Sequence, residues 1–288
     1  MKTAVITGTS TGIGFATSVH LARNGYRVFA GMRDPRKGAA LREAAGEGDL
    51  PIEVIEMDVC DSDSVSRAFA GVEAAGPVDV LVNNAGISGS AALEDVPEHE
   101  HRQIFETNYF GTVRCIQAVV GSMRERRTGS IVNVSSAAGL FATPTQIPYS
   151  ASKWAVECLG EALAHELVRF GVRVVNVEPG VVKTHIFQNS AAQSHFDKAS
   201  PYAPTMRRIG KIFAAGLQKP SEAEAVAETI LEAITAPEAR LRWPVGADAV
   251  AFHAATPRPT SDEWIRLAEE PSEDEYDARF EKLFGITL

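Results

Sequence analysis

The sequence predicts an α/β domain built on a doubly wound, parallel, seven-stranded sheet flanked by helices. Short apolar runs alternate along the chain with longer stretches of helical periodicity, as in repeated βαβ units. Several runs are nearly continuous in valine and isoleucine, as expected of strands covered on both faces. A glycine-rich turn follows the first run directly. The expected strands are residues 3–7, 27–31, 52–57, 78–83, 130–135, 173–178 and 241–245.

Helical periodicity fills the intervals between these strands. Ser221 and Glu224 have the spacing of a capping box, which predicts the start of the last helix before the final strand. The expected helices are residues 13–24, 64–74, 98–126, 149–170 and 222–236.

The 288 residues are expected to form one domain, 1–288, because no linker or repeat divides them. Two segments interrupt the alternation. Residues 184–220 form a long insertion of mixed character, and loops of that length in a compact domain are usually functional or disordered. Residues 257–288 form an acidic tail, expected to be a helical extension with a solvated acidic face.

Composition excludes several classes of function. The net charge of −9 repels phosphate backbones and anionic lipid, so nucleic acid is not expected as a partner. The chain has no apolar run long enough to span a bilayer, and nothing in it resembles a signal peptide, so neither a membrane span nor a leader is expected. Cys60, Cys115 and Cys158 are too scattered for a disulfide framework, and no metal-ligand spacing occurs. We therefore expect a cytoplasmic protein with reduced thiols and no metal.

The glycine-rich turn predicts a dinucleotide site. The segment TGTSTGIG carries Gly8, Gly12 and Gly14 between an apolar strand and an amphipathic helix. Glycines there permit close approach to a pyrophosphate, and the helix directs its free N–H groups at the phosphates. A mononucleotide P-loop is excluded because no Gly-Lys-Ser/Thr follows. The context favours a Rossmann-type domain over the alternative, a glycine loop with no ligand.

The end of the second strand indicates which dinucleotide is bound. A carboxylate there would bind the adenosine ribose and repel a 2′-phosphate. The chain instead reads Ala30-Gly31-Met32-Arg33, and the guanidinium can pair with a phosphate. NADP(H) is therefore favoured, while NAD(H) stays possible because Asp34 could neutralise the arginine.

Tyr149 and Lys153 predict the chemistry. They lie four residues apart in YSASK, so their side chains can converge on one face of a helix. A phenol is a poor base at its ordinary pKa of about 10, and a neighbouring cation favours the phenolate. Such a pair alone is more often a surface feature. However, Ser136 ends an apolar strand nearby and can hydrogen-bond a substrate oxygen, with Ser135 as the second choice.

These motifs, in this order, resemble those of the short-chain dehydrogenase/reductase family over about residues 1–250. The chain is similar to the single-domain branch, and VFAGMRDP resembles its hydroxysteroid and retinol dehydrogenase-like members. The resemblance implies four catalytic residues: Asn108, Ser136, Tyr149 and Lys153. Together with the residues already discussed, it implies cofactor contacts at Gly8, Ser10, Thr11, Gly12, Ile13, Gly14, Arg33, Asp58, Val59, Asn84, Ala85, Gly86, Tyr149, Lys153, Pro179, Gly180, Val182 and Thr184.

The resemblance implies an NAD(P)-dependent oxidoreductase acting on CH–OH or C=O groups. Tyr149 would donate a proton to a carbonyl oxygen, or accept it in reverse. Lys153 would lower the pKa of that phenol and hold the nicotinamide ribose, and Ser136 would stabilise the substrate oxygen. Asn108 would hold a water that links the lysine to solvent. Many NADP(H)-dependent members carry a basic residue where this chain has Thr11, which keeps the cofactor preference open.

The substrate is expected to be a lipophilic ketone or secondary alcohol. Phe141 and Phe187 are the expected apolar wall, with Ser136 and Tyr149 at the reacting oxygen. The insertion 184–220 follows the nicotinamide-binding segment, so we interpret it as a substrate lid. Further candidates for the wall are Leu93, Ile147 and Phe213, and His185 is a candidate polar contact with the substrate.

Two other classes share this fold. An NADPH-binding regulator would keep the cofactor site without turnover, and the intact set of Ser136, Tyr149 and Lys153 argues against it. A sugar epimerase or dehydratase would need a larger C-terminal domain. The resemblance also implies a homodimer or homotetramer, formed through the helices around Asn108 and Tyr149.

Overall fold

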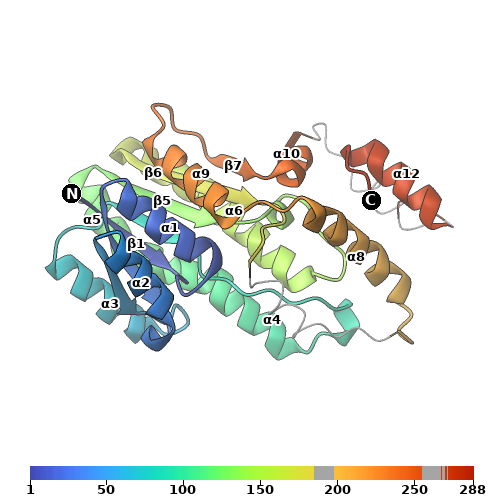
Figure 1. The fold of residues 1–288 in the computed structure, drawn as a ribbon, viewed down its shortest axis with the longest axis horizontal. Helices are drawn as coiled ribbons and strands as arrows, with labels where there is room; N and C mark the ends of the chain where they lie inside the picture. Colours follow the sequence, from blue (N-terminus) through green and yellow to red (C-terminus); the bar gives the residue numbers. More distant parts are fainter. Residues whose placement is uncertain (185–197, 255–266, 268–269, 271) are drawn as a thin grey trace.

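The computed structural model describes residues 1–184, 198–254, 267, 270 and 272–288. Its sheet has seven strands in the order β3-β2-β1-β4-β5-β6-β7, and every neighbouring pair is parallel (Figure 1). The order reverses between β1 and β4, the position at which doubly wound sheets bind ligands. All seven expected strands are confirmed: β1 (Lys2–Thr7), β2 (Tyr26–Met32), β3 (Ile52–Glu56), β4 (Val80–Asn83), β5 (Gly129–Val134), β6 (Val172–Pro179) and β7 (Arg242–Val245).

Helices cover both faces of the sheet, as the valine-rich strands predict. Alternate residues of a strand serve the two faces, so Ile6 packs in one apolar layer and Val5 in the other. In Figure 1, α1 and α9 lie side by side on one face. That face carries α1 (Gly12–Arg23), α2 (Ala39–Glu47) and α9 (Ala223–Thr235). The other carries α3 (Ser62–Ala74), α5 (Gly111–Arg126) and α6 (Ile147–Leu167).

The long helix expected over 98–126 is not continuous. The chain forms α4 (Glu98–Phe105), then a π-helical turn at Glu106–Phe110, and then α5. Within the turn, the Asn108 side chain is hydrogen-bonded to both the N–H and the C=O of Ile87, at 2.9 Å each. Turns of this kind are rare and are frequent at functional sites.

A third group of helices lies beside the carboxyl ends of the strands, at the right of Figure 1. It consists of α8 (Ala203–Gln218), α10 (Ala247–Ala254) and α12 (Glu273–Phe284). The helical tail is confirmed by α12, but its acidic face is not simply solvated. Glu273 forms ion pairs with Arg208 and Lys211 of α8. None of the described helices combines the length and apolar character needed to cross a bilayer.

The expected capping box at Ser221 is wrong. The Ser221 N–H donates to the Val181 carbonyl at 3.0 Å, and the residue forms a parallel bridge with Val182. The chain is therefore still extended there, and α9 begins at Ala223 without a side-chain cap. This bridge ties the start of α9 to the segment that follows β6.

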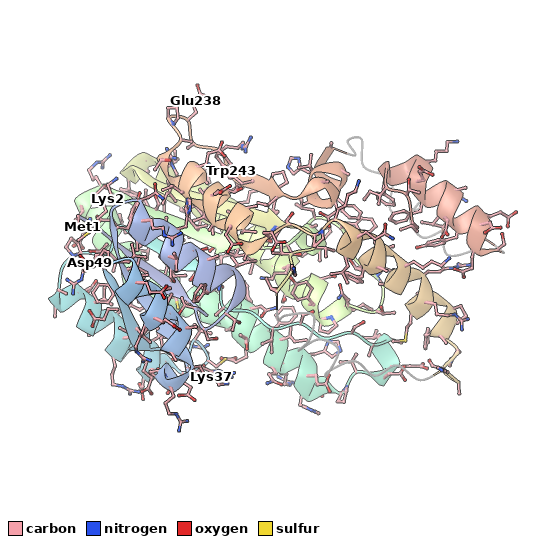
Figure 2. The ribbon with its side chains drawn as sticks, viewed as in Figure 1. Met1, Lys2, Lys37, Asp49, Glu238 and Trp243 are labelled. Atoms are coloured by element: carbon pink, nitrogen blue, oxygen red, sulfur yellow. The ribbon has the colours of Figure 1, made fainter. Side chains whose placement is uncertain are left out.

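An aromatic residue is buried at the outer edge of the sheet, on β7. Trp243 is buried, its indole N–H donates to the Arg240 carbonyl at 2.8 Å, and the Arg240 guanidinium lies 3.8 Å above its ring. In Figure 2, Trp243 lies below the turn that carries Glu238. The neighbouring Arg242 points to the other face, toward α6.

Candidate active site

A cavity of about 680 Å³ at the carboxyl ends of the strands collects nearly all of the predicted site residues. Gly14 and Asn108 lie outside its wall, and Phe187 and His185 fall outside the described residues. The predicted residues in the wall are Gly8, Ser10, Thr11, Gly12, Ile13, Arg33, Asp58, Val59, Asn84, Ala85, Gly86, Ser136, Phe141, Tyr149, Lys153, Pro179, Gly180, Val182, Thr184 and Phe213.

The glycine turn fits a pyrophosphate. Gly8 and Gly12 have φ of +70° and +60°, a region that favours glycine. A Cβ on Gly14 would collide with the Gly8 carbonyl and the Asn84 amide, so only glycine allows α1 to start this close to the turn. The Thr11 side chain forms no capping hydrogen bond, which leaves the first N–H groups of α1 available to an anion.

The segment after β4 braces this turn. The Asn84 side-chain amide donates to the carbonyls of Thr7, at 2.8 Å, and Gly8, at 3.1 Å. In return, the Thr7 hydroxyl accepts from the N–H groups of Asn84 and Ala85, at 3.0 and 2.9 Å. The turn is thus held in shape by contacts within the protein.

Arg33 is exposed in the cavity wall, at the end of β2. Asp34 does not neutralise it, because that carboxylate pairs with Arg36 at 2.8 Å, and this contact lowers the pKa of Asp34. Lys37 is also exposed, near the lower edge of the molecule in Figure 2, and is not part of the wall. No carboxylate of the described chain forms an ion pair with Arg33.

Ser136 and Tyr149 meet inside the cavity. Ser136 caps a short turn, where its Oγ accepts from the Ala138 N–H at 3.1 Å. Burial raises the pKa of Tyr149, and its hydrogen bond with Ser136 lowers it. The net direction is upward, so the expected lowering of this pKa is not found, and the phenol is protonated at neutral pH. Ser135 also lines the cavity, but it is buried and its hydroxyl has no hydrogen-bond partner in the described part of the chain, whereas Ser136 acts on the Tyr149 phenol, which supports Ser136 as the first choice.

The position of Lys153 explains why its positive charge does not lower the pKa of Tyr149 below the ordinary value. Its Nζ donates to the Val134 carbonyl at 2.8 Å and lies 5.8 Å from the centroid of the Tyr149 ring. Burial lowers the pKa of Lys153 to about 8, while Glu157 raises it. The ammonium of Lys153 therefore begins to lose its proton not far above neutral pH. It lies on the wall of a cavity that is large enough for a dinucleotide.

Asn108 lies behind the wall and connects two of its parts. Its amide donates to the Ser152 hydroxyl at 2.9 Å, and that hydroxyl donates to the Tyr149 carbonyl at 2.7 Å. With its bonds to Ile87, the side chain joins the loop after Gly86 to α6. The water-holding role expected for Asn108 stays a prediction.

The far end of the cavity is apolar and comes largely from residues that the sequence analysis missed. Phe141 stacks on Phe252 of α10 with ring centroids 5.3 Å apart. Ile212 of α8 and Ile286, just after α12, complete this wall. An available signal was the spacing of Tyr276, Phe280 and Phe284, which places three aromatic rings on one face of the tail helix.

Two expected wall residues are misplaced. Leu93 and Ile147 are 56% and 41% exposed and do not line the cavity. Leu93 lies in a short turn before α4, and Ile147 is the first residue of α6, where its side chain faces outward.

Among the described residues, no three His, Cys, Asp or Glu side chains gather as a metal site.

The sequence of the chain matches a known family. A family model described as short chain dehydrogenase matches residues 2–195. Retinol dehydrogenase 8 from Homo sapiens is 36% identical over 257 residues, covering 84% of this chain and 80% of that protein. The human 17-beta-hydroxysteroid dehydrogenase type 1 is 36% identical over 252 residues, covering 83% and 76%.

Solved structures agree. A short-chain dehydrogenase from Streptomyces avermitilis superposes with a TM-score of 0.80 and 33% identity, covering 93% of this chain and 97% of that one. A variant of actinorhodin polyketide ketoreductase, solved with NADPH, superposes with a TM-score of 0.74 and 30% identity, covering 84% and 95%. The chain therefore belongs to the short-chain dehydrogenase family and is an oxidoreductase of alcohol and carbonyl groups that binds a nicotinamide cofactor.

Proposed function

We propose that this protein is an NADP(H)-dependent oxidoreductase of lipophilic ketones or secondary alcohols, with Tyr149 as the general acid and base. One observation carries the proposal. The hydroxyls of Ser136 and Tyr149 lie in a single cavity that has Arg33 and the glycine turn at one end and an aromatic wall at the other.

The roles of the residues follow from their chemistry. A bound nicotinamide supplies or accepts the hydride. The Ser136 hydroxyl orients the substrate oxygen and stabilises its developing charge. Tyr149, whose raised pKa keeps the phenol protonated, transfers its proton to that oxygen during reduction. The Lys153 ammonium would hold ribose hydroxyls of the bound cofactor, and it would supply the proton that replaces the one lost by the phenol while taking up a proton from solvent in turn.

The preference for NADP(H) rests on Arg33. Its guanidinium is unpaired within the described chain and lines the cavity where a 2′-phosphate would lie. The related polyketide ketoreductase was solved with NADPH. Ligand binding raises the melting temperature by mass action, so we expect a larger increase with NADPH than with NADH at matched concentrations.

Two variants test this preference. Arg33→Ala should remove most of the difference between the two cofactors, whereas Lys37→Ala, at an exposed residue outside the cavity wall, should preserve it. A wild-type protein that is stabilised more by NADH would overturn the NADP(H) assignment.

The aromatic wall and the names of the relatives support a lipophilic substrate. Phe141, Phe213 and Phe252 surround the far end, and α8 within the insertion 184–220 contributes one side, as a lid would. Turnover should therefore improve from small ketones to aryl and polycyclic ketones, measured as kcat/KM with NADPH. Stabilisation by NADPH without turnover of any ketone would favour a cofactor-binding regulator.

We also propose a homo-oligomer formed through α5 and α6. Phe110, Ile147 and Trp154 are 47%, 41% and 45% exposed, and two of them lie on the helix that carries the catalytic pair. Large apolar side chains left open on one side of a domain favour a subunit interface. Light scattering should give a dimer or tetramer, and Trp154→Glu should shift it toward the monomer; a monomeric wild type would contradict the proposal.

A further inference from the structure

A ladder of buried amides crosses three strands at one register. Asn83, Asn133 and Asn176 pair with one another across β4, β5 and β6, and the last pairs with Arg242 on β7. Asn83 donates to Asn133 at 3.0 Å, and Asn133 donates to Asn176 at 3.1 Å. Amides buried among valines are costly unless each is hydrogen-bonded, so a continuous ladder specifies one register.

The ladder ends on Glu157 of α6. Its Oε2 accepts from the Asn176 amide at 2.9 Å and from Arg242 Nε at 3.1 Å. The residue is only 4% exposed. Gly160 permits this approach, because a Cβ there would collide with the Asn176 amide. The sheet thus fixes α6 through a defined polar contact, in addition to apolar packing.

Glu157 also lies between the two parts of the catalytic group. It follows Lys153 by one helical turn, on the same face. On its other side is the short turn after Ser136: a Cβ added to Gly139 would lie 3.1 Å from both Glu157 Cγ and the Lys153 carbonyl. A shift of Glu157 would therefore move the strand end that carries the serine relative to the helix that carries the lysine.

We propose that Glu157, held by Asn176 and Arg242, is a positioning residue of this active site: it sets the place of Lys153 and the α6 turn relative to Ser136. The proposal rests on the proposed function. Glu157 does not line the cavity. It acts through the residues that do, because reacting groups displaced by even a fraction of an ångström lose much of their catalytic effect.

The charge of Glu157 provides a readout that packing alone would not. Its carboxylate raises the pKa of Lys153, which burial brings down to about 8. The other charged groups of the described chain around Glu157 are Arg242 on β7, Glu178 on β6 and Glu161 on α6. Glu157→Gln keeps the size of the side chain but removes its charge, so the ammonium of Lys153 should be lost at a lower pH.

Glu161→Gln is the matched control. Glu161 lies on the same helix and also binds Arg242, at 2.7 Å, but its side chain is 66% exposed and one turn farther from Lys153. The experiment compares kcat against pH for full-length wild type, Glu157→Gln and Glu161→Gln, with NADPH and an aryl ketone. For Glu157→Gln, we expect the alkaline limb to move down by roughly 0.5–1 pH unit. We also expect kcat in the neutral range to fall about tenfold.

The control should match wild type in both respects, and NADPH should raise the melting temperature of all three proteins equally at mildly acidic pH. Glu157→Asp keeps the charge but shortens the reach, so it should retain the wild-type alkaline limb with a lower kcat. The proposal is overturned if Glu157→Gln has the same kcat and the same alkaline limb as Glu161→Gln.

A stability measurement needs no turnover. In a double-mutant cycle of Lys153→Met and Glu157→Gln, the coupling in the free energy of unfolding should be favourable below the pKa of Lys153. As pH rises through that pKa, the lysine becomes neutral and the coupling should disappear. A coupling that is zero, or equal at both pH values, would contradict the proposal. A wild type inactive on all ketones, but with this pH-dependent coupling, would count against the proposed function alone.

Discussion

The two ends of the cavity are built by different kinds of contact. At the cofactor end, the glycine turn, the end of β2 and the segment after β4 are short pieces of local sequence that meet at neighbouring strand ends. At the substrate end, Phe141 meets Phe252 and Phe284, which come from segments far apart along the chain. If the proposed function holds, binding of the cofactor depends on local sequence, whereas selection of the substrate depends on how the C-terminal helices dock.

The first prediction addresses the point where the two ends meet. Tyr149→Phe removes the proton donor but keeps the ring, so turnover should fall by roughly 10²–10⁴-fold. Stabilisation by NADPH should be unchanged, because the cofactor end does not depend on the hydroxyl. Tyr202→Phe, at an exposed tyrosine just before α8 and outside the cavity, is the control and should retain full activity. Normal turnover by Tyr149→Phe would contradict the role of Tyr149 as the proton donor.

A substitution at Gly14 should impair binding of the cofactor without changing the substrate end of the cavity. A Cβ in Gly14→Ala would collide with the Gly8 carbonyl and the Asn84 amide, and the backbone must shift at a cost of about 1–3 kcal/mol. The increase in melting temperature caused by NADPH should largely disappear. Gly71→Ala in α3, where nothing lies within 4 Å of the added Cβ, should instead stabilise the fold slightly and bind NADPH normally. Equal NADPH binding by the two variants would contradict the fit of the turn to a pyrophosphate.

A substitution at Phe252 should weaken binding of the ketone without changing the cofactor end of the cavity. Phe252→Ala removes one of the stacked rings of the wall, so KM for an aryl ketone should rise roughly tenfold. Stabilisation by NADPH should remain at the wild-type level, because Phe252 is far from the glycine turn in sequence and packs against Phe141 and Phe284. If the variant lost cofactor binding and substrate binding together, the two ends would not be independent.

The smallest effect is expected where α12 docks on α8. The Lys211 ammonium lies 2.8 Å from Glu273 and 3.3 Å from Asp277, and its side chain is 40% exposed. Exposed pairs contribute little, so Lys211→Gln should raise KM for the ketone only about twofold. In wild type, added salt should raise KM in the same direction by screening these pairs. A KM independent of both changes would show that apolar packing alone holds α12.

The same comparison explains which parts could be predicted from the sequence. The seven strands follow from local valine and isoleucine runs, and Gly8, Arg33, Tyr149 and Lys153 belong to short motifs whose spacing already implies convergence. Phe252 and Ile286 could not be placed in this way, because the docking of α10 and α12 depends on contacts across the whole chain.

Two local expectations failed for physical reasons of their own. Ser221 has the sequence of a helix cap, but its N–H is used by the Val181 carbonyl, so the chain stays extended. The π-helical turn at Asn108 has no periodic signal, and within it the Asn108 side chain forms two hydrogen bonds to Ile87. In both places a contact with a distant segment prevails over local propensity.

The central claim is that the Ser136 and Tyr149 hydroxyls direct hydride transfer between NADPH and a lipophilic ketone. The most direct test is to incubate the protein with NADPH deuterated at the transferring position and an aryl ketone, and to examine the alcohol by NMR. We predict deuterium on the carbinol carbon with wild type and, in the same incubation time, at least about 100-fold less deuterated alcohol with Tyr149→Phe. A protein that is stabilised by NADPH but transfers no deuterium to any ketone of the series would contradict the claim.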